Sequence, residues 1–340
     1  MDASIPVPRQ THRVARPSGR LHWRAPMTGY RPPFPWIETL PGAAAVAHAG
    51  RQGWLDLGAD APPLLQGVLI GVGVLGPDGK QTPAFAQAWT DHRVDIMARA
   101  QFYCRAASDV AGGLGDLAAN LPAFMDRAET FRLFRYETAQ STDPTALSET
   151  AQWVDYLEAL ARVESPVLAP LMPFARGDHV LEVGGNTGLM AAALAPAGVR
   201  VEVLDLPAVC ALGQQRRPDV TFYAGDGREI TGHPIREARF DGVLFKSVLH
   251  DWPEEDAERM LSQALSLLGD GGRIVICERD RPGPRSLAVP TMQGLANLVF
   301  APFYRGASFY VDWMERHGMV VSVERLSLDM PFILLSGTQR

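Results

Sequence analysis

The sequence is short of cysteine and contains no apolar run long enough to cross a membrane. Its three cysteines, Cys104, Cys210 and Cys277, are far apart and match no metal-binding spacing, so we expect reduced core thiols in a cytoplasmic protein. The longest apolar stretch, residues 64–75, is interrupted by Gln66 and falls short of the roughly 18 residues that span a bilayer. The first residues contain no apolar segment typical of a secretory signal. Membrane insertion and secretion are therefore not expected.

Basic residues are fewer than acidic residues, except at the beginning of the chain. The 38 acidic residues outnumber the 32 basic ones and give a net charge of −6, which disfavours a nucleic-acid-binding protein. Residues 1–35 nevertheless contain six arginines and seven prolines against one acidic residue. Such a segment buries little apolar surface, so we interpret residues 1–40 as an arm that is ordered only where something holds it. Lys80 and Lys246 are the only lysines.

The region after the arm has the pattern of helices. Apolar residues recur with helical spacing in four segments: 42–55, 94–119, 121–136 and 149–168. The stretch VLGPDGKQTP at 74–83 is typical of a turn between two short extended pieces. This pattern predicts a mainly helical domain over residues 41–163.

Residues 164–340 have the pattern of an α/β domain. Seven runs are typical of strands: 179–183, 200–206, 220–226, 240–248, 272–278, 319–326 and 332–337. The first five alternate with helical segments, which predicts parallel pairing in a doubly wound sheet. The last two are joined by a link too short for a crossover helix, so the final strand is expected to be antiparallel.

The stretch VLEVGGNTG at 180–188 comes where the first predicted strand of this sheet ends. Ligands of doubly wound sheets bind beyond the carboxyl ends of the strands. Gly184 and Gly185 would let the backbone approach a ligand, and Asn186 tolerates the left-handed backbone conformation better than most residues. The helix that follows would offer its N-terminal amides. A glycine-rich turn alone is shared by several nucleotide-binding folds.

Two acidic residues stand at the ends of the next two predicted strands. Asp205 ends the second strand, where a carboxylate can accept hydrogen bonds from both hydroxyls of a ribose. Asp226 ends the third strand, further along the same edge of the sheet. Asp205 fits either a dinucleotide or S-adenosylmethionine, whereas a dinucleotide site does not require Asp226. Each acid could also be a helix cap or an ordinary loop residue.

The stretch FKSVLHDWPEEDAERML at 245–261 makes the pattern specific. The sequence resembles small-molecule O-methyltransferases of the caffeic-acid type, a family of plants and bacteria. Its motifs occur in the family's order: the glycine-rich loop, Asp205-Leu206-Pro207, Gly225-Asp226, Lys246, His250-Asp251-Trp252 and Glu278. The resemblance covers about 165–340 well and 40–163 loosely, where the winged-helix element is shortened. It implies a class I methyltransferase Rossmann-like sheet, mostly parallel with an antiparallel last strand, and a mainly helical, winged-helix-like N-terminal dimerisation domain.

The resemblance also implies a cofactor and a catalytic base. S-adenosylmethionine, released as S-adenosylhomocysteine, would be bound by Glu182, Gly184, Gly185, Asp205, Leu206, Asp226, Gly227 and Lys246. His250 would take the proton of a substrate hydroxyl, and Glu278 would hold its imidazole in the productive tautomer. Asp251 is interpreted as the N-cap of a helix over 252–268, with Glu254 completing a capping box.

The sequence departs from the family at the second acidic neighbour of the histidine. Tyr304 stands where the family has a glutamate, and Arg305 matches the arginine that follows. Pro302 stands where metal-binding relatives have a histidine, so no metal is expected. Substrate contacts are expected from Phe131, Arg135, Met292, Asn297, Phe300, Phe303, Tyr304 and Arg305, with Phe134 and Tyr136 as further candidates. Arg135 or Arg305 in a pocket would favour a carboxylate-bearing substrate.

We therefore expect a cytoplasmic homodimer that methylates an aromatic or enolic hydroxyl of a small molecule in secondary metabolism. It would bind neither nucleic acid nor membranes. C-methylation of a 2-oxo acid would need the same base and stays open. A non-methylating enzyme that keeps the cofactor as a positioned charge also stays open. A transcriptional regulator is disfavoured by the net charge, and a nicotinamide dehydrogenase by Asp226, Lys246 and the His250–Glu278 pair.

Overall fold

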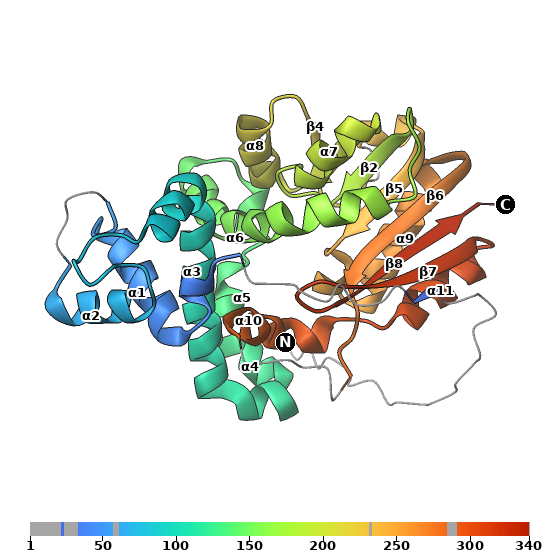
Figure 1. Ribbon diagram of the computed structural model, residues 1–340. Helices are drawn as coiled ribbons and strands as arrows, with labels where there is room; N and C mark the ends of the chain where they lie inside the picture. The colour runs from blue at the N-terminus through green and yellow to red at the C-terminus, as the bar shows by residue number, and fades with distance from the viewer. Residues whose placement is uncertain (1–21, 24–32, 57–60, 231–232, 284–290, 340) are drawn as a thin grey trace.

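The computed structural model describes residues 22–23, 33–56, 61–230, 233–283 and 291–339 (Figure 1). Most of the predicted arm therefore lies outside the described residues. Its described parts include strand β1 (His22–Trp23), which pairs in parallel with β7 (Val320–Ser327), and a 3-10 turn, η1 (Pro35–Ile37). Within the described ranges, no helix is long and apolar enough to cross a membrane.

Six helices occupy the described residues between 40 and 168. They are α1 (Leu40–Arg51), α2 (Pro63–Gly71), α3 (Pro83–Ala119), α4 (Leu121–Arg127), α5 (Glu129–Leu133) and α6 (Pro144–Leu168). The turn predicted at 74–83 is present, and its two arms meet in one antiparallel bridge between Leu75 and Gln81. The wing is therefore reduced to a single bridge between α2 and α3.

The helix predicted over 121–136 is broken at Ala128. This residue adopts an extended backbone between α4 and α5. The carboxylate of Asp109, on α3, accepts hydrogen bonds from the backbone N–H groups of Glu129 and Thr130 at 2.9 and 2.8 Å. These bonds satisfy the first amides of α5 and start a new helix there. Tyr136 consequently leaves the helical path.

An eight-stranded sheet forms the second part, in the order β1-β7-β8-β6-β5-β2-β3-β4. Besides β1 and β7, its strands are β2 (His179–Val183), β3 (Arg200–Asp205), β4 (Thr221–Ala224), β5 (Phe240–Lys246), β6 (Leu268–Arg279) and β8 (Pro331–Thr338). Strands β2 to β6 pair in parallel, and β8 runs antiparallel to both β6 and β7. The predicted α/β class and the antiparallel last strand are confirmed, whereas β1 was not predicted.

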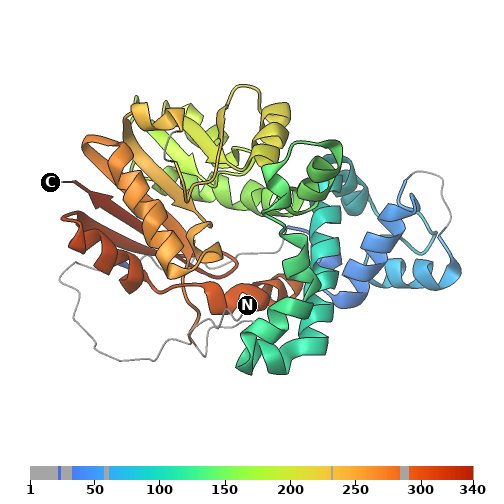
Figure 2. The same ribbon diagram turned by 180° about the vertical axis from the view of Figure 1, so that it is seen from behind.

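Helices cover both faces of the sheet. They are α7 (Leu189–Leu194), α8 (Pro207–Arg216), α9 (Glu254–Leu267) and α11 (Ala307–Arg316). Helix α10 (Met292–Phe300) is not one of them. Figure 2 shows α9 and α11 lying over one face. Side chains alternate along the strands, so that Leu181 packs toward α9 while Val180 packs toward α7.

Helix α10 leaves the sheet and joins the helical part. Its residues Met292, Ala296 and Val299 are buried in the core built by α1, α3 and η1. Figure 1 shows α10 beside α3 and α4. The segment after β6 therefore reaches across to the helices and closes one side of the space between the two parts.

Candidate active site

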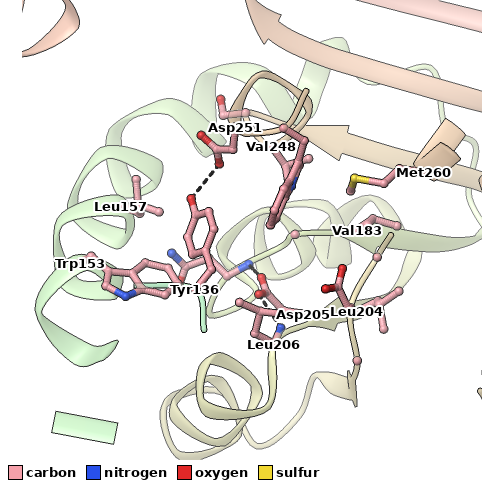
Figure 3. Close-up of a pocket in the computed structure, with 17 residues that line it drawn as sticks. Tyr136, Trp153, Leu157, Val183, Leu204, Asp205, Leu206, Val248, Asp251 and Met260 are labelled. Atoms are coloured by element: carbon pink, nitrogen blue, oxygen red, sulfur yellow. Dashed lines mark hydrogen bonds between the residues drawn. The ribbon is translucent and has the colours of Figure 1, made fainter. Parts of the chain in front are cut away.

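Three adjoining cavities lie at the carboxyl ends of the parallel strands. All three are bordered by Leu157 of α6 and by Ser247, which follows β5. The first cavity follows β2, β3 and β4 (Figure 3), the second lies between the glycine-rich loop and α6, and the third opens toward α5 and α10. They lie where the sequence predicted a ligand, at the edge of the sheet beside the first strand's glycine-rich turn.

The glycine-rich loop requires its small residues. Gly184 has a φ of 71°, and a Cβ there would lie 2.5 Å from a methyl group of Val248. Asn186 has a φ of 51°, in the left-handed region that the sequence predicted for it. The Asp205 carboxylate accepts hydrogen bonds from the backbone N–H groups of Asn186 and Leu206, at 2.8 and 2.7 Å. These two bonds fix the loop to the end of β3.

Several polar atoms of the second cavity are buried without a hydrogen-bond partner. They are Oε2 of Glu182, Oγ of Ser165, and both Oδ1 and Nδ2 of Asn186. Burial raises the pKa of Glu182 to about 8. Beside them, Nζ of Lys246 lies 2.6 Å from Oε2 of Glu164. Buried polar groups rarely stay unpaired in native proteins, so this set calls for a polar ligand with both donors and acceptors.

The first cavity is bordered by the two acidic residues Asp205 and Asp226, which were predicted at the ends of the second and third strands of the α/β domain. Burial raises the pKa of Asp205 to about 6. Asp226 is held by Arg228, whose Nε and Nη2 lie 3.0 and 2.6 Å from its two oxygens. The Arg228 guanidinium lies 3.9 Å from the ring centre of Trp252, which also borders the cavity. Leu206, Gly227 and Gly184 border it too, while Gly185 borders the second cavity.

His250 is fixed by Glu278. Its Nδ1 lies 2.7 Å from Oε2 of Glu278, and the other oxygen of Glu278 accepts the backbone N–H groups of Val248 and Leu249 at 2.9 and 2.8 Å. One carboxylate thus positions both the imidazole and the 3-10 turn η6 (Leu249–Asp251) that carries it. Burial lowers the pKa of His250, but the negative charges of Glu278 and Asp251 outweigh it and the net shift is upward. The same pairing outweighs burial and lowers the pKa of Glu278.

The prediction that Asp251 caps a helix is wrong. Helix α9 begins at Glu254, its N-cap residue is Pro253, and no side chain caps it. Proline favours an extended conformation in the residue before it, so the chain cannot enter the helix directly from η6. Asp251 instead faces the cavities. Its Oδ2 accepts a hydrogen bond from the Tyr136 hydroxyl at 2.9 Å, and its Oδ1 lies 3.4 Å from Nε2 of His250.

The third cavity is lined mainly by aromatic rings and encloses about 1000 Å³, its open mouth included. The rings come from Phe131, Phe134, Tyr136, Tyr156, Phe300, Phe303 and Tyr304. The polar members are Ser247, His250, Asp251, Arg279 and Asn297. Tyr304 lies edge-on to the imidazole of His250, with ring centres 5.0 Å apart. The structure thus brings five of the eight predicted substrate residues together: Phe131, Asn297, Phe300, Phe303 and Tyr304.

The other three predicted substrate residues do not border this cavity. Arg135 is exposed and lies 3.8 Å from Glu149. Met292 is buried in the core of the helical part. Arg305 is buried and donates hydrogen bonds to the carbonyls of Leu249, at 2.7 Å, and of Trp252. Arg305 therefore supports the turn that carries His250, and its guanidinium is not available to a substrate.

Sequence reasoning missed the arginine that does border the cavities. Arg279 follows Glu278 at the end of β6 and lines both the second and the third cavity. Its guanidinium donates to Oε1 of Glu164 and lies 3.8 Å from Asp329. A charged residue directly after the predicted strand 272–278 was the available signal. Glu164 could not have been found in this way, because α6 reads as an ordinary amphipathic helix.

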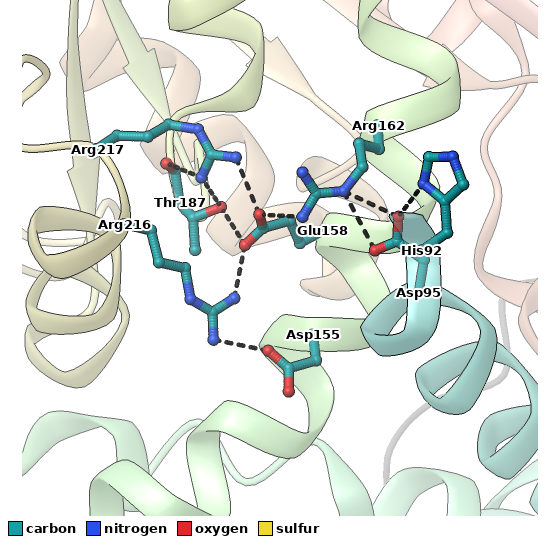
Figure 4. A network of polar contacts seen from close by, with 8 residues as sticks. All are labelled: His92, Asp95, Asp155, Glu158, Arg162, Thr187, Arg216 and Arg217. Atoms are coloured by element: carbon teal, nitrogen blue, oxygen red, sulfur yellow. Dashed lines mark hydrogen bonds and ion pairs between the residues drawn. The ribbon is translucent and has the colours of Figure 1, made fainter. Parts of the chain in front are cut away.

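A second network holds the glycine-rich loop from the side of α6 (Figure 4). Glu158 of α6 accepts a hydrogen bond from Oγ1 of Thr187 at 2.8 Å. It also forms ion pairs with Arg216 and Arg217, at 2.6 and 2.9 Å. Burial raises the pKa of Glu158, but these arginines outweigh it and lower the pKa to about 2. Arg217 also donates to the Thr187 hydroxyl and carbonyl, at 2.9 and 3.0 Å. The loop is therefore tied to both α6 and the end of α8.

Across the ranges described above, no three His, Cys, Asp or Glu side chains gather into a group that could hold a metal ion.

Sequence comparison finds curated relatives over part of the chain. 3-Hydroxy-5-methyl-1-naphthoate 3-O-methyltransferase of Streptomyces sahachiroi is 30% identical over 152 residues, which cover 41% of this chain and 42% of that protein. Trans-resveratrol di-O-methyltransferase of Vitis vinifera is 30% identical over 138 residues, with 38% and 37% covered. The chain thus spans less than half the length of these curated relatives.

Solved structures match over more of the chain. An O-methyltransferase family protein from Burkholderia thailandensis gives a TM-score of 0.65 at 16% identity, covering 87% of this chain and 94% of its own. The O-methyltransferase NcsB1 from neocarzinostatin biosynthesis, solved with S-adenosyl-L-homocysteine and 1,4-dihydroxy-2-naphthoic acid, gives 0.61 at 19% identity, covering 87% and 96%. These likenesses establish the fold. The sequence model of the O-methyltransferase domain family matches residues 127–298, which is half of the chain. The protein therefore belongs to the O-methyltransferase domain family.

Proposed function

We propose that the protein transfers a methyl group from S-adenosylmethionine to a hydroxyl group of a small aromatic molecule of secondary metabolism. His250 acts as the general base, and Glu278 orients it. The observation that carries the proposal is the His250–Glu278 pair, which borders an aromatic cavity directly beside the cavities of the glycine-rich loop. The activities of the curated relatives support the reaction class, since both relatives named above are O-methyltransferases of aromatic compounds.

The residues of the first two cavities fit the cofactor. S-adenosylmethionine has an amino acid moiety, and the unpaired buried atoms of Glu182, Ser165 and Asn186 offer it donors and acceptors. Asp205 at the end of β3 suits the ribose hydroxyls, and the cavity continues past Leu206 and Gly227 to Asp226 and Trp252, where a flat adenine fits. When bound, the cofactor supplies a methyl group already activated by its sulfonium.

The chain supplies the base and its orientation. Because Glu278 accepts a hydrogen bond at Nδ1, the neutral imidazole carries its proton there and presents the lone pair of Nε2. A substrate hydroxyl in the third cavity would give its proton to Nε2 as the methyl group is transferred. Glu278 then stabilises the imidazolium that forms. Arg305, bound to two carbonyls of the same region, keeps the turn of His250 in place.

The walls of the third cavity favour a flat aromatic substrate. Phe134 and Phe300 meet edge to face, with centres 5.8 Å apart, as do Phe131 and Phe300 at 5.9 Å. Such walls accept a further aromatic ring by edge-to-face or offset contact. Arg135 and Arg305, which were the reasons to expect a carboxylate on the substrate, lie outside this cavity. The cationic charge of Arg279 is already paired with Glu164.

We also propose a homodimer formed through the helical part. Helices α1 and α2 expose large apolar side chains, with Leu40 and Leu64 at 51% and 86% of their full accessibility. Leu64 lines an open groove together with Pro41, Trp54 and Val68, and Leu40 directly precedes Pro41 in the chain. Light scattering should give a mass near twice 37 kDa, and a monomeric mass at micromolar concentration would contradict the proposal.

The function is tested by offering methyl-labelled S-adenosylmethionine with a panel of hydroxylated naphthalenes, other phenols and 2-oxo acids. Label recovered as an O-methyl ether of an aromatic compound is the expected result. Label on carbon of a 2-oxo acid would replace the proposal by C-methylation. Tight cofactor binding with the cofactor left unconsumed, while a substrate is converted, would replace it by a non-methylating reaction.

A further inference from the structure

His250 lies between two carboxylates, one at each ring nitrogen. Oε2 of Glu278 accepts a hydrogen bond from Nδ1 at 2.7 Å, and Oδ1 of Asp251 lies 3.4 Å from Nε2. Nε2 is the nitrogen that the proposed mechanism uses. Asp251 is therefore placed at the atom that must lose and gain the proton, while Tyr304, in the position expected for a second glutamate, brings no charge.

Asp251 is itself held by a residue of the helical part. The Tyr136 hydroxyl donates to Oδ2 of Asp251 at 2.9 Å, and Figure 3 shows this hydroxyl directed at the carboxylate. The Tyr136 ring is fixed by two tryptophans, with centres 5.5 Å from Trp153 and 5.4 Å from Trp252. Packing thus sets where the hydroxyl points. Both Tyr136 and Asp251 border the first and the third cavity.

The titratable and charged groups facing His250 come from three elements. Strand β6 contributes Glu278 and also Arg279, which opposes the two carboxylates, and η6 contributes Asp251. The segment after α10 contributes Tyr304, and burial raises the pKa of its hydroxyl, so that it is neutral at physiological pH. Arg305 is turned toward backbone carbonyls. Asp251 is then the second carboxylate at this imidazole within the described part of the chain.

We propose that Tyr136 and Asp251 form the second support of His250, in which the Tyr136 hydroxyl holds the Asp251 carboxylate beside Nε2 without letting it close on that nitrogen. Both are positioning residues. The inference rests on the proposed role of His250 as base and adds to it the residues that decide when Nε2 is free.

The arrangement has a predictable effect on protonation. The Tyr136 hydroxyl stabilises the charged carboxylate, so the carboxylate attracts the proton on Nε2 less strongly. Without this hydroxyl, the coupled Asp251–His250 pair holds its protons more tightly, and its apparent pKa values rise. Without the charge of Asp251, the imidazolium loses one partner and the pKa of His250 falls. The two losses therefore act in opposite directions, which a merely structural contact would not produce.

The experiment compares wild type, Tyr136→Phe and Asp251→Asn. The imidazole of His250 is titrated by NMR in the full-length protein, with its signal assigned by His250→Ala, and kcat/KM is followed against pH. We expect Tyr136→Phe to raise the pKa of His250 and the acidic limb by about 0.5 to 1 unit, and Asp251→Asn to lower both by a similar amount. Tyr223→Phe is the matched control, because Tyr223 donates to Glu202 at 3.0 Å outside the three cavities.

An unchanged His250 titration in Tyr136→Phe, or a shift in the same direction in both variants, would overturn the inference. The NMR titration needs no turnover, so it tests the contact even if the protein proves not to methylate. Conversely, if the protein catalyses the proposed methyl transfer but the His250 pKa is the same in Tyr136→Phe and wild type, this inference alone is refuted and the proposed function stands. If Asp251→Asn does not fold, the direction of the shift in Tyr136→Phe decides.

Discussion

Glu278 and His250 form a single hydrogen-bonded unit, with Oε2 of the carboxylate 2.7 Å from Nδ1 of the imidazole. The second oxygen of Glu278 is occupied by two backbone N–H groups of the turn that carries His250. The carboxylate is therefore rigid, and it cannot turn away from the imidazole without breaking both bonds. This unit is where the proposed reaction is most directly testable.

Replacing His250 with alanine should abolish the base and leave the cofactor cavities intact. His250 borders the third cavity only. We expect turnover to fall by roughly 100-fold or more, with the dissociation constant for S-adenosylmethionine nearly unchanged. Calorimetry and a methyl-transfer assay check this. His92→Ala is a control, since its side chain is half exposed on α3. Wild-type turnover in His250→Ala would remove the assignment.

The pH dependence should reflect the upward shift of the His250 pKa. Activity requires the neutral imidazole, so kcat/KM should rise with pH through a value above the usual 6.5 of histidine. Glu278→Gln removes the main charge that favours the imidazolium. Its acidic limb should therefore move to lower pH, while kcat falls because the imidazolium formed in the reaction is less stabilised. An acidic limb that moves to higher pH would contradict this account.

Cofactor binding should weaken on acidification because of Asp205. Burial raises its pKa to about 6, and only the ionised carboxylate can accept from both ribose hydroxyls while still holding the N–H groups of Asn186 and Leu206. The dissociation constant for S-adenosylmethionine, measured by calorimetry between pH 5 and 8, should rise as the pH falls through about 6. Asp205→Asn should bind weakly and without this dependence. A flat profile in the wild type would remove the ribose assignment.

The sequence was sufficient for the seven strands β2 to β8, though not for β1, and for the acidic residues at the carboxyl ends of β3 and β4. Parallel strands buried on both faces appear as continuous apolar runs. Asp205, which ends β3, and Asp226, two residues beyond β4, border the same cavity because parallel strands end at the same edge. The loop conformation of Asn186 followed from its residue type. These features depend on local chemistry, which is why they could be predicted.

What the sequence could not reveal depends on partners distant in the chain. Only the fold turns Arg305 toward backbone carbonyls and Arg279 toward the cavities. The break at Ala128 depends on Asp109, about twenty residues away. The prediction that Asp251 caps a helix failed because Pro253 keeps Trp252 extended and α9 begins only at Glu254.

Glu158 joins α6 to the glycine-rich loop. Its side chain is buried and accepts from Thr187 and from two arginines at the end of α8. Glu158→Gln keeps the shape and removes the charge, leaving Arg216 and Arg217 without their shared buried partner. We expect the free energy of unfolding to fall by about 3 kcal/mol, as when one member of a buried ion pair is removed.

The same change should reach the cofactor through Thr187. With its carboxylate partner weakened, the loop is held by fewer bonds, and we expect S-adenosylmethionine to bind about 10-fold more weakly while kcat at saturation changes little. Asp155→Asn is the matched control, because Asp155 pairs with Arg216 at 2.6 Å without contacting the loop. Calorimetry and thermal unfolding on both variants separate the two effects. Equal losses in cofactor affinity for both variants would mean that Glu158 acts only through general stability, since the direct tie to Thr187 is what distinguishes it from Asp155.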